Sequence, residues 1–150
     1  MLPIGTKAPE ISLPCHTGET VSLSQFAGKK IVLYFYPKDN TSGCTKQAQG
    51  FTALLDEFHA KTAVVIGVSC NSVAPHQRFI EKQGLRHMLL ADENAEMVKL
   101  YDVWHEKKMA GRTYMGIVRS TYIIDEEGVI THAFPNVKAA TNPTDMLQLI

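Results

Sequence analysis

Hydrophobic and polar positions change period along residues 30–70, and this change predicts a strand, a helix and a second strand. Residues 30–36 form a nearly continuous apolar run rich in β-formers, which is typical of a buried central strand. Residues 64–68 form a second short run of this kind. Between them, four apolar residues recur at steps of three, four and three, as on one face of a helix: Ala48, Phe51, Leu55 and Phe58. Such a unit is expected to be parallel with a right-handed crossover.

Shorter signals predict the elements on either side. Ser72 and Pro75 mark the start of a further helix and Gly84 its end. A brief strand at 88–91 precedes Asp92, which could cap a helix that carries Met97, Leu100 and Tyr101.

The last third of the chain predicts a hairpin and a closing helix. Strands at 117–124 and 129–134 flank a four-residue turn that ends in Gly128. Residues 144–150 are expected to form a helix, and residues 1–29 an irregular entry with short extended pieces at 10–13 and 20–23.

This order of elements predicts an α/β fold of thioredoxin-like layout, with a central mixed β-sheet and helices on both faces. A chain of 150 residues suits one domain, 1–150, with a core of its own.

The charge balance and the length of the apolar stretches argue against nucleic acid and membranes as partners. Fifteen basic residues balance fifteen acidic ones, so nothing directs the chain to nucleic acid or to an anionic membrane. The longest apolar stretches, such as 63–68, are too short to span a bilayer. Residues 1–5 lack the features of a secretory signal, so a cytoplasmic protein is expected.

Three cysteines stand at positions 15, 44 and 70, without a C-x-x-C pair. An odd, low count fits a reducing compartment and reactive thiols better than a disulfide scaffold. The same spacing argues against a zinc site.

Cys44 carries the main chemical signal. It follows the strand, a proline and a short polar loop, at the point where a helix should begin. The unpaired N–H groups and partial positive charge of a helix start favour a thiolate, which is the nucleophilic form. A free cysteine is only about 3% ionised at pH 7, and a helix end contributes roughly 0.5–2 kcal/mol, so a cationic partner is expected as well.

Arg119 is the candidate for that partner. It interrupts the beginning of the apolar strand at 117–124, where a buried charge would be costly without a purpose. A guanidinium could hold both a thiolate and a substrate oxygen. Thr41 is expected to point its hydroxyl toward the same pocket, and Pro37 to fix the strand exit and shield the sulfur.

These residues form the pattern Pro-x-x-x-Thr-x-x-Cys, through Pro37, Thr41 and Cys44. With it the chain resembles the peroxiredoxins, most closely the bacterioferritin-comigratory or peroxiredoxin Q subfamily. The likeness runs from about Gly5 to Phe134. Further segments that carry it are 34–41, 43–45, 67–69, 72–73 with His76 and Phe79, 114–117 and 119–121.

The resemblance implies a thiol-dependent peroxidase that reduces hydrogen peroxide and organic hydroperoxides. Cys44 would be the peroxidatic cysteine and would become a sulfenic acid. Thr41 would orient the peroxide, Arg119 would stabilise the developing charge, and the backbone N–H groups at Gly43 and Cys44 would complete the pocket. No metal, flavin or haem is required. Thioredoxin or a similar thiol donor would be the reductant, and a monomer is expected, with a weak dimer as the alternative.

The usual resolving cysteine is missing from this pattern. The two positions where the subfamily carries it hold Gln49 and Ile80. An external thiol, Cys70 or Cys15 could therefore resolve the sulfenic acid, with Cys70 favoured over Cys15 because it ends the neighbouring strand. A bridge from Cys70 to Cys44 would need Cα atoms within roughly 7 Å. An engineered replacement at Gln49 is also left open.

Other interpretations compete with this one. Cys44 could act in a non-catalytic redox sensor or partner-binding module, whereas a thiol–disulfide oxidoreductase would want the absent C-x-x-C motif. Thr41 could serve as a helix cap and Arg119 as a paired strand-end residue. The six histidines have no ligand spacing and are expected in surface or loop positions, with His76 in a local hydrogen bond. Three residues could line an apolar rim or a partner surface, although packing roles are favoured for them: Trp104, Tyr114 and Met115.

Overall fold

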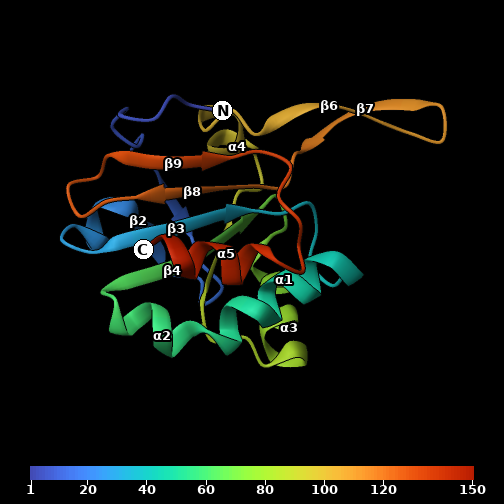
Figure 1. Cartoon of the computed structure of the whole chain (residues 1–150). Helices are drawn as coiled ribbons and strands as arrows, with labels where there is room; N and C mark the ends of the chain where they lie inside the picture. The colour runs from blue at the N-terminus through green and yellow to red at the C-terminus, as the bar shows by residue number, and fades with distance from the viewer.

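A five-stranded mixed sheet forms the centre of the structure, a computed structural model that describes all residues from Met1 to Ile150. Its strands, in the spatial order β5–β4–β3–β8–β9, are Met88–Ala91, Ala63–Ser69, Lys30–Phe35, Ser120–Ile124 and Ile130–Phe134. β3 and β5 run parallel to β4, whereas β8 is antiparallel to both β3 and β9. The predicted mixed sheet is confirmed (Figure 1).

Helices cover both faces of this sheet, as predicted. Alternate residues of β3 point to opposite faces, so Val32 and Tyr34 join one core and Leu33 and Phe35 the other. The helices whose side chains enter the first core are α1 Ser42–Ala53, α2 Leu55–Ala60, α3 Val73–Gln83 and α5 Asn142–Leu149. The second core is closed by α4 Glu96–Leu100 and by the N-terminal β1 Ser12–Pro14, β2 Thr20–Ser22 and 3-10 helix Leu23–Phe26. No helix in the chain combines the length and the apolar character needed to cross a membrane.

Local sequence signals place several element ends where they were predicted. Gly84 ends α3 with a φ of 63°, in the left-handed region that glycine adopts easily. Gly128 has a φ of 82° in the turn between β8 and β9. The Asp92 carboxylate accepts hydrogen bonds from the N–H groups of Glu96 and Val98, each at 2.9 Å, at the start of α4. These signals depend on residues that are close together in the chain, so the sequence alone predicts them.

The helix predicted from Ala48 to Phe58 is divided at Leu54 into α1 and α2. The apolar period nevertheless continues across the division. Leu54 N–H donates to the Gly50 carbonyl at 3.3 Å, and Phe58 N–H donates to the Leu54 carbonyl at 3.1 Å. This spacing keeps Leu55 and Phe58 on the buried face although the regular helix is interrupted.

The strand predicted over residues 117–124 is wrong in its first part. A separate hairpin, β6 Trp104–Met109 and β7 Arg112–Ile117, ends before β8 begins at Ser120. In Figure 1 this hairpin extends away from the rest of the fold. Because no core covers its tip, it lacks the buried alternation that would reveal it in the sequence. Tyr114 and Met115 are 40% and 51% exposed, so their expected packing roles are also wrong.

Candidate active site

The loop after β3 delivers Cys44 to the first turn of a helix, as predicted. β3 ends at Phe35, and α1 begins at Ser42 with Thr41 at the N-cap position. Cys44 is the third residue of α1, and its side chain is buried, with 1% exposed. The first N–H groups of a helix have no carbonyl one turn earlier within it, so the main chain around Gly43 and Cys44 offers donors and partial positive charge.

Arg119 reaches this sulfur from the segment just before β8, at the same edge of the sheet. Its Nη2 lies 3.3 Å from Cys44 Sγ, within hydrogen-bonding distance. Ser120 is paired with Phe35 in the antiparallel ladder between β8 and β3, which places Arg119 just beyond the end of β3. Arg119 therefore lies in the link between β7 and β8 rather than within a strand, which corrects the predicted placement.

Glycine at position 43 permits the guanidinium to come this close. A Cβ atom at Gly43 would lie 3.3 Å from Arg119 Nη2, which is closer than side chains ordinarily tolerate. The absence of a side chain in the first turn of α1 thus leaves room for the cation beside Cys44.

A buried polar network holds the other side of the guanidinium. Arg119 Nη1 donates to Gln47 Oε1 at 2.6 Å. Gln47 Nε2 in turn donates to Asn142 Oδ1 at 3.0 Å, and the Thr121 hydroxyl donates to the same oxygen at 2.9 Å. Gln47, Thr121 and Asn142 are all buried, so they fix the guanidinium in a site with little water. Gln47 and Asn142 were not predicted, and only the polar character of Gln47 beside the apolar helix face hinted at it.

Thr41 and Pro37 stand at the solvent side of the same loop. The Thr41 hydroxyl donates to the Lys38 carbonyl at 2.9 Å, and its side chain makes no capping bond to α1. Its oxygen retains lone pairs that can accept a hydrogen bond. Pro37 is exposed and directly follows the buried Tyr36.

Comparison with known proteins identifies this arrangement. Residues 4–133 match the AhpC/TSA family. The chain belongs to that family.

Curated relatives place the chain among the peroxiredoxins. It is 45% identical over 147 residues to peroxiredoxin Bcp of Bacillus subtilis, covering 98% of this chain and 94% of the relative. It is 40% identical over 141 residues to peroxiredoxin Bcp of Escherichia coli K12, covering 94% of this chain and 90% of the relative.

Solved structures agree with this placement and confirm the thioredoxin-like fold. A mutant of Xylella fastidiosa PrxQ superposes with a TM-score of 0.95 at 34% identity, covering 99% of this chain and 95% of the other. The bacterioferritin comigratory protein of Xanthomonas campestris gives a TM-score of 0.88 at 37% identity, covering 93% and 88%. The chain is thus a peroxiredoxin of the Bcp/PrxQ group and a thiol-dependent peroxidase.

The two other cysteines of this peroxiredoxin have different surroundings. Cys70 directly follows β4 and is half-buried. Burial, and then the nearby Asp92 carboxylate, raise the pKa of Cys70 to about 11. Cys15 is buried beside Leu90 of β5, and its sulfur lies 3.0 Å from the Thr17 hydroxyl. All three cysteines are free thiols in the structure.

The residues at the two usual resolving positions, Gln49 and Ile80, have no thiol and serve in packing and in a surface hydrogen bond. Gln49 is exposed on α1 and donates to Gln83 Oε1 on α3 at 3.0 Å. Ile80 is partly buried and packs against the core beneath α1 and α3. No group of three or more His, Cys, Asp or Glu side chains is arranged to hold a metal ion.

Two histidines are buried. His87 lies in the loop between α3 and β5, in line with the expected loop position, whereas the partners of His76 lie outside its own helix and correct the expected local hydrogen bond. His76 is fully buried, with ring nitrogens 2.6 Å from Asp39 Oδ2 and 2.8 Å from the Leu90 carbonyl oxygen. His87 is 3% exposed and lies 2.7 Å from the Tyr34 hydroxyl. Spacing along the chain could not reveal them, because their partners come from other elements.

Proposed function

We propose that this peroxiredoxin works by a one-cysteine cycle in which Cys44 reduces the peroxide and an external thiol restores it. The observation that supports this most is the 3.3 Å contact between Arg119 Nη2 and Cys44 Sγ. A fixed cation at that distance from the sulfur is in place to stabilise the negative charge that develops on the peroxide oxygens.

The chemistry divides into two balanced steps. In the first, the Cys44 thiolate attacks one peroxide oxygen, an S–O bond forms and the O–O bond breaks. The departing oxygen takes a proton and leaves as water or as an alcohol, and Cys44 becomes a sulfenic acid. In the second, a donor thiol attacks this sulfur and releases water, and a second donor thiol frees Cys44 from the mixed disulfide.

The remaining site residues receive roles that suit their positions. Arg119 stabilises the thiolate and the charge spread over the breaking O–O bond. The N–H groups of Gly43 and Cys44 point outward from the helix start and suit an oxygen of the bound peroxide. Thr41 orients the peroxide through its free lone pairs, and Pro37 fixes the exit from β3.

The surroundings of the other cysteines favour an external reductant. A thiol must ionise to attack a sulfenic acid, and the pKa of Cys70, raised to about 11, leaves roughly one thiolate in ten thousand at pH 7. Cys15 is buried against β5. We therefore assign regeneration to a dithiol donor such as thioredoxin rather than to Cys70 or Cys15.

Further parts of the assignment rest on the same family. The X. campestris relative is described with alkyl peroxide reduction activity, so we include organic hydroperoxides beside hydrogen peroxide among the substrates. Residues 1–150 are proposed to act as one domain and as a monomer. The three free thiols suit a reducing compartment such as the cytoplasm.

Intact-mass measurement after one equivalent of hydrogen peroxide tests the cycle. The expected product gains one oxygen, is trapped by a sulfenic-acid reagent, and disappears in Cys44→Ser. Loss of two hydrogens instead would show an internal disulfide and overturn the one-cysteine proposal.

Turnover measurements complete this test and separate an enzyme from a single-use redox sensor. With excess thioredoxin, Cys70→Ser and Cys15→Ser are expected to consume peroxide within about twofold of the unmodified protein, because neither supplies a thiolate in the cycle. A sensor would react once and stop. A Cys70→Ser variant that stalls after one turnover would assign regeneration to Cys70.

A further inference from the structure

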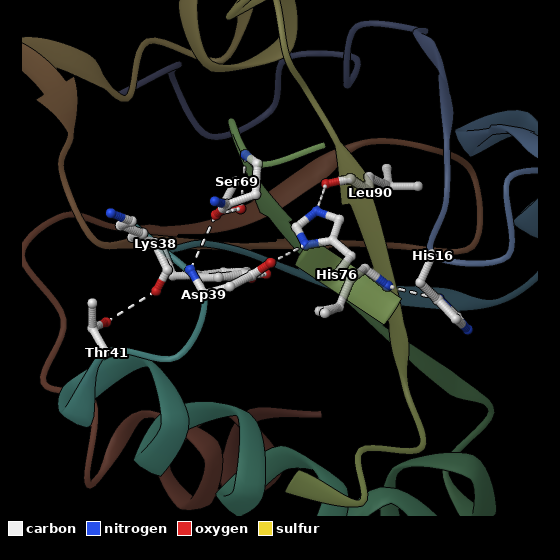
Figure 2. Close-up of polar contacts among 10 residues, drawn as sticks. His16, Lys38, Asp39, Thr41, Ser69, His76 and Leu90 are labelled. Atoms are coloured by element: carbon white, nitrogen blue, oxygen red, sulfur yellow. Dashed lines mark hydrogen bonds and ion pairs between the residues drawn. The ribbon is translucent and has the colours of Figure 1, made fainter. Parts of the chain in front are cut away.

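The loop between β3 and α1 is anchored through Asp39, whose side chain is only 3% exposed. Asp39 Oδ1 accepts a hydrogen bond from the Tyr36 hydroxyl at 2.6 Å, and Oδ2 lies 2.6 Å from His76 Nδ1. The Asp39 N–H donates to Asn71 Oδ1 at 3.0 Å. Figure 2 shows Asp39 reaching from the loop toward His76 of α3, with Thr41 farther along the same loop. One buried residue thus ties the loop to Tyr36 directly after β3, to Asn71 after β4 and to α3.

The partners of His76 determine where its protons lie. Nε2 faces the Leu90 carbonyl at 2.8 Å, and a carbonyl only accepts, so Nε2 carries a proton. Nδ1 faces a carboxylate at 2.6 Å, so a second proton lies in that bond. Asp39 and His76 therefore form a buried, hydrogen-bonded pair, and a replacement of His76 that offers no donor at the Nδ1 position leaves the Asp39 carboxylate unpaired.

His87 is a buried histidine without this role, and it provides a matched comparison. Its Nε2 lies 2.7 Å from the Tyr34 hydroxyl and its Nδ1 lies 3.0 Å from the Thr52 hydroxyl. Hydroxyls can donate or accept, so a neutral ring satisfies both contacts. Burial lowers the pKa of His87 to about 3, in keeping with a neutral ring. Neither of its partners belongs to the loop between β3 and α1.

The anchored loop determines both the position and the cover of Cys44. Only four residues separate Asp39 from Cys44, and Gly43 lies against the Arg119 guanidinium. Displacement of the loop would therefore move the sulfur relative to Arg119 Nη2, now 3.3 Å away. The same displacement would uncover Cys44, which is 1% exposed, so a protein thiol reaches its sulfur only when the loop moves.

We propose that Asp39 and His76 are a positioning pair that holds Cys44 against Arg119 for reaction with peroxide and keeps it covered. The inference rests on the proposed function of Cys44. It assigns to His76 of α3, which does not bond to the Cys44 sulfur, control over the position of that sulfur and over its accessibility. The pair speeds attack on a small peroxide and slows access of a bulky thiol or reagent.

Two conservative replacements of His76 test the pair. His76→Gln places its amide nitrogen where Nε2 stood, so it can still donate to Leu90 but loses Asp39. His76→Asn places its amide nitrogen where Nδ1 stood, so it retains a donor for Asp39. His87→Gln controls for the general effect of altering a buried histidine. All are made with Cys15→Ser and Cys70→Ser, so that Cys44 is the only thiol.

Two rates are measured on each reduced variant: oxidation of Cys44 by hydrogen peroxide, and alkylation of Cys44 by a maleimide that carries a polyethylene glycol chain. In His76→Gln we expect oxidation to slow by about ten- to a hundredfold while alkylation becomes faster, because a shift near 1 Å costs about that much. His76→Asn and His87→Gln are expected to remain within about threefold of the parent in both rates.

The opposite changes in the two rates separate positioning from general destabilisation. Unchanged rates in His76→Gln, or equal effects in His87→Gln, would overturn the proposal. If His76→Gln does not fold, Asn71→Ser removes the acceptor for the Asp39 N–H at a partly exposed position and should shift both rates in the same directions, less strongly. Wild-type protein that fails to react with peroxide would refute the proposed function, whereas the alkylation rates would still test the pair.

Discussion

Cys44 and Cys70 occupy similar places in the fold and differ in chemistry. They follow β3 and β4, two adjacent parallel strands whose last paired residues are Phe35 and Val68, so both come after the same edge of the sheet. Cys44 lies under the Arg119 guanidinium, 3.3 Å from its Nη2. Cys70 lies near the Asp92 carboxylate, and burial together with this charge raises its pKa to about 11. The comparison teaches that the surroundings of a thiol, its burial and the charge that faces it, rather than the strand end that carries it, govern whether it can act as a nucleophile.

Removal of the Arg119 cation should bring the reactivity of Cys44 closer to that of Cys70. Arg119→Gln is expected to slow oxidation of Cys44 by peroxide by about 10²- to 10³-fold, because a preorganised donor at the developing charge is lost. The oxidation rate of Arg119→Lys should fall between those of the parent and Arg119→Gln, since lysine retains the charge but loses the planar guanidinium. Stopped-flow oxidation with limiting peroxide measures these rates. A rate within twofold of the parent in Arg119→Gln would remove Arg119 from the mechanism.

Loss of the support behind the cation should have a smaller effect. Gln47→Leu removes the oxygen that accepts from Arg119 Nη1 at 2.6 Å, so the guanidinium loses its fixed orientation. We expect kcat/KM for peroxide to fall by about tenfold, as for a modest misplacement of a catalytic group. Gln49→Leu is the matched control, because that residue is exposed on the same helix and its side chain hydrogen-bonds to Gln83 rather than to Arg119. Equal effects of the two variants would contradict the role of Gln47.

The smallest change should come from altering the charge beside Cys70. In a background with Cys15→Ser and Cys44→Ser, Asp92→Asn is expected to lower the pKa of Cys70 below about 11, because a neutral amide no longer opposes the thiolate. The pKa should stay above that of a free cysteine, since burial is the larger cause. Lys99→Gln should shift it upward, because Lys99 favours the thiolate.

The pH dependence of thiol alkylation measures this pKa directly. Below the pKa, the rate should rise by about tenfold per pH unit as the thiolate fraction grows. A profile that levels off near pH 8 in the parent would show that Cys70 is more reactive than proposed. It would also reopen its assignment as a resolving cysteine.

Local patterns in the sequence predicted the strand, loop and helix around Cys44 well. The apolar run from residue 30, the loop and the helical period of Ala48 and Phe51 act over a few residues, so neighbours along the chain specify them. The same is true of the helix end at Gly84 and of the turn at Gly128. Recognition of the Pro37, Thr41 and Cys44 pattern added the family, which the comparisons confirm.

Among the contacts between distant segments, only the one from Arg119 to Cys44 was predicted, because a charged residue in an apolar stretch is conspicuous in the sequence. Arg119 was visible because it interrupts an apolar stretch, although its strand was placed wrongly. Gln47 and Asn142 are 95 residues apart, and no local period joins them. The hairpin β6–β7 was missed because its strands are mostly exposed and their residues do not alternate between core and solvent.

The sequence by itself determined that a thiol would stand at a helix start after a buried strand, since capping, period and chain punctuation are local. Only the tertiary structure decided which charge each thiol meets. The register of β8 on β3 brings Arg119 to Cys44 across 75 residues, and the packing of α3 brings His76 to Asp39 across 37. Such pairings depend on how whole elements dock, because a one-residue change in strand register would turn each side chain to the opposite face of the sheet.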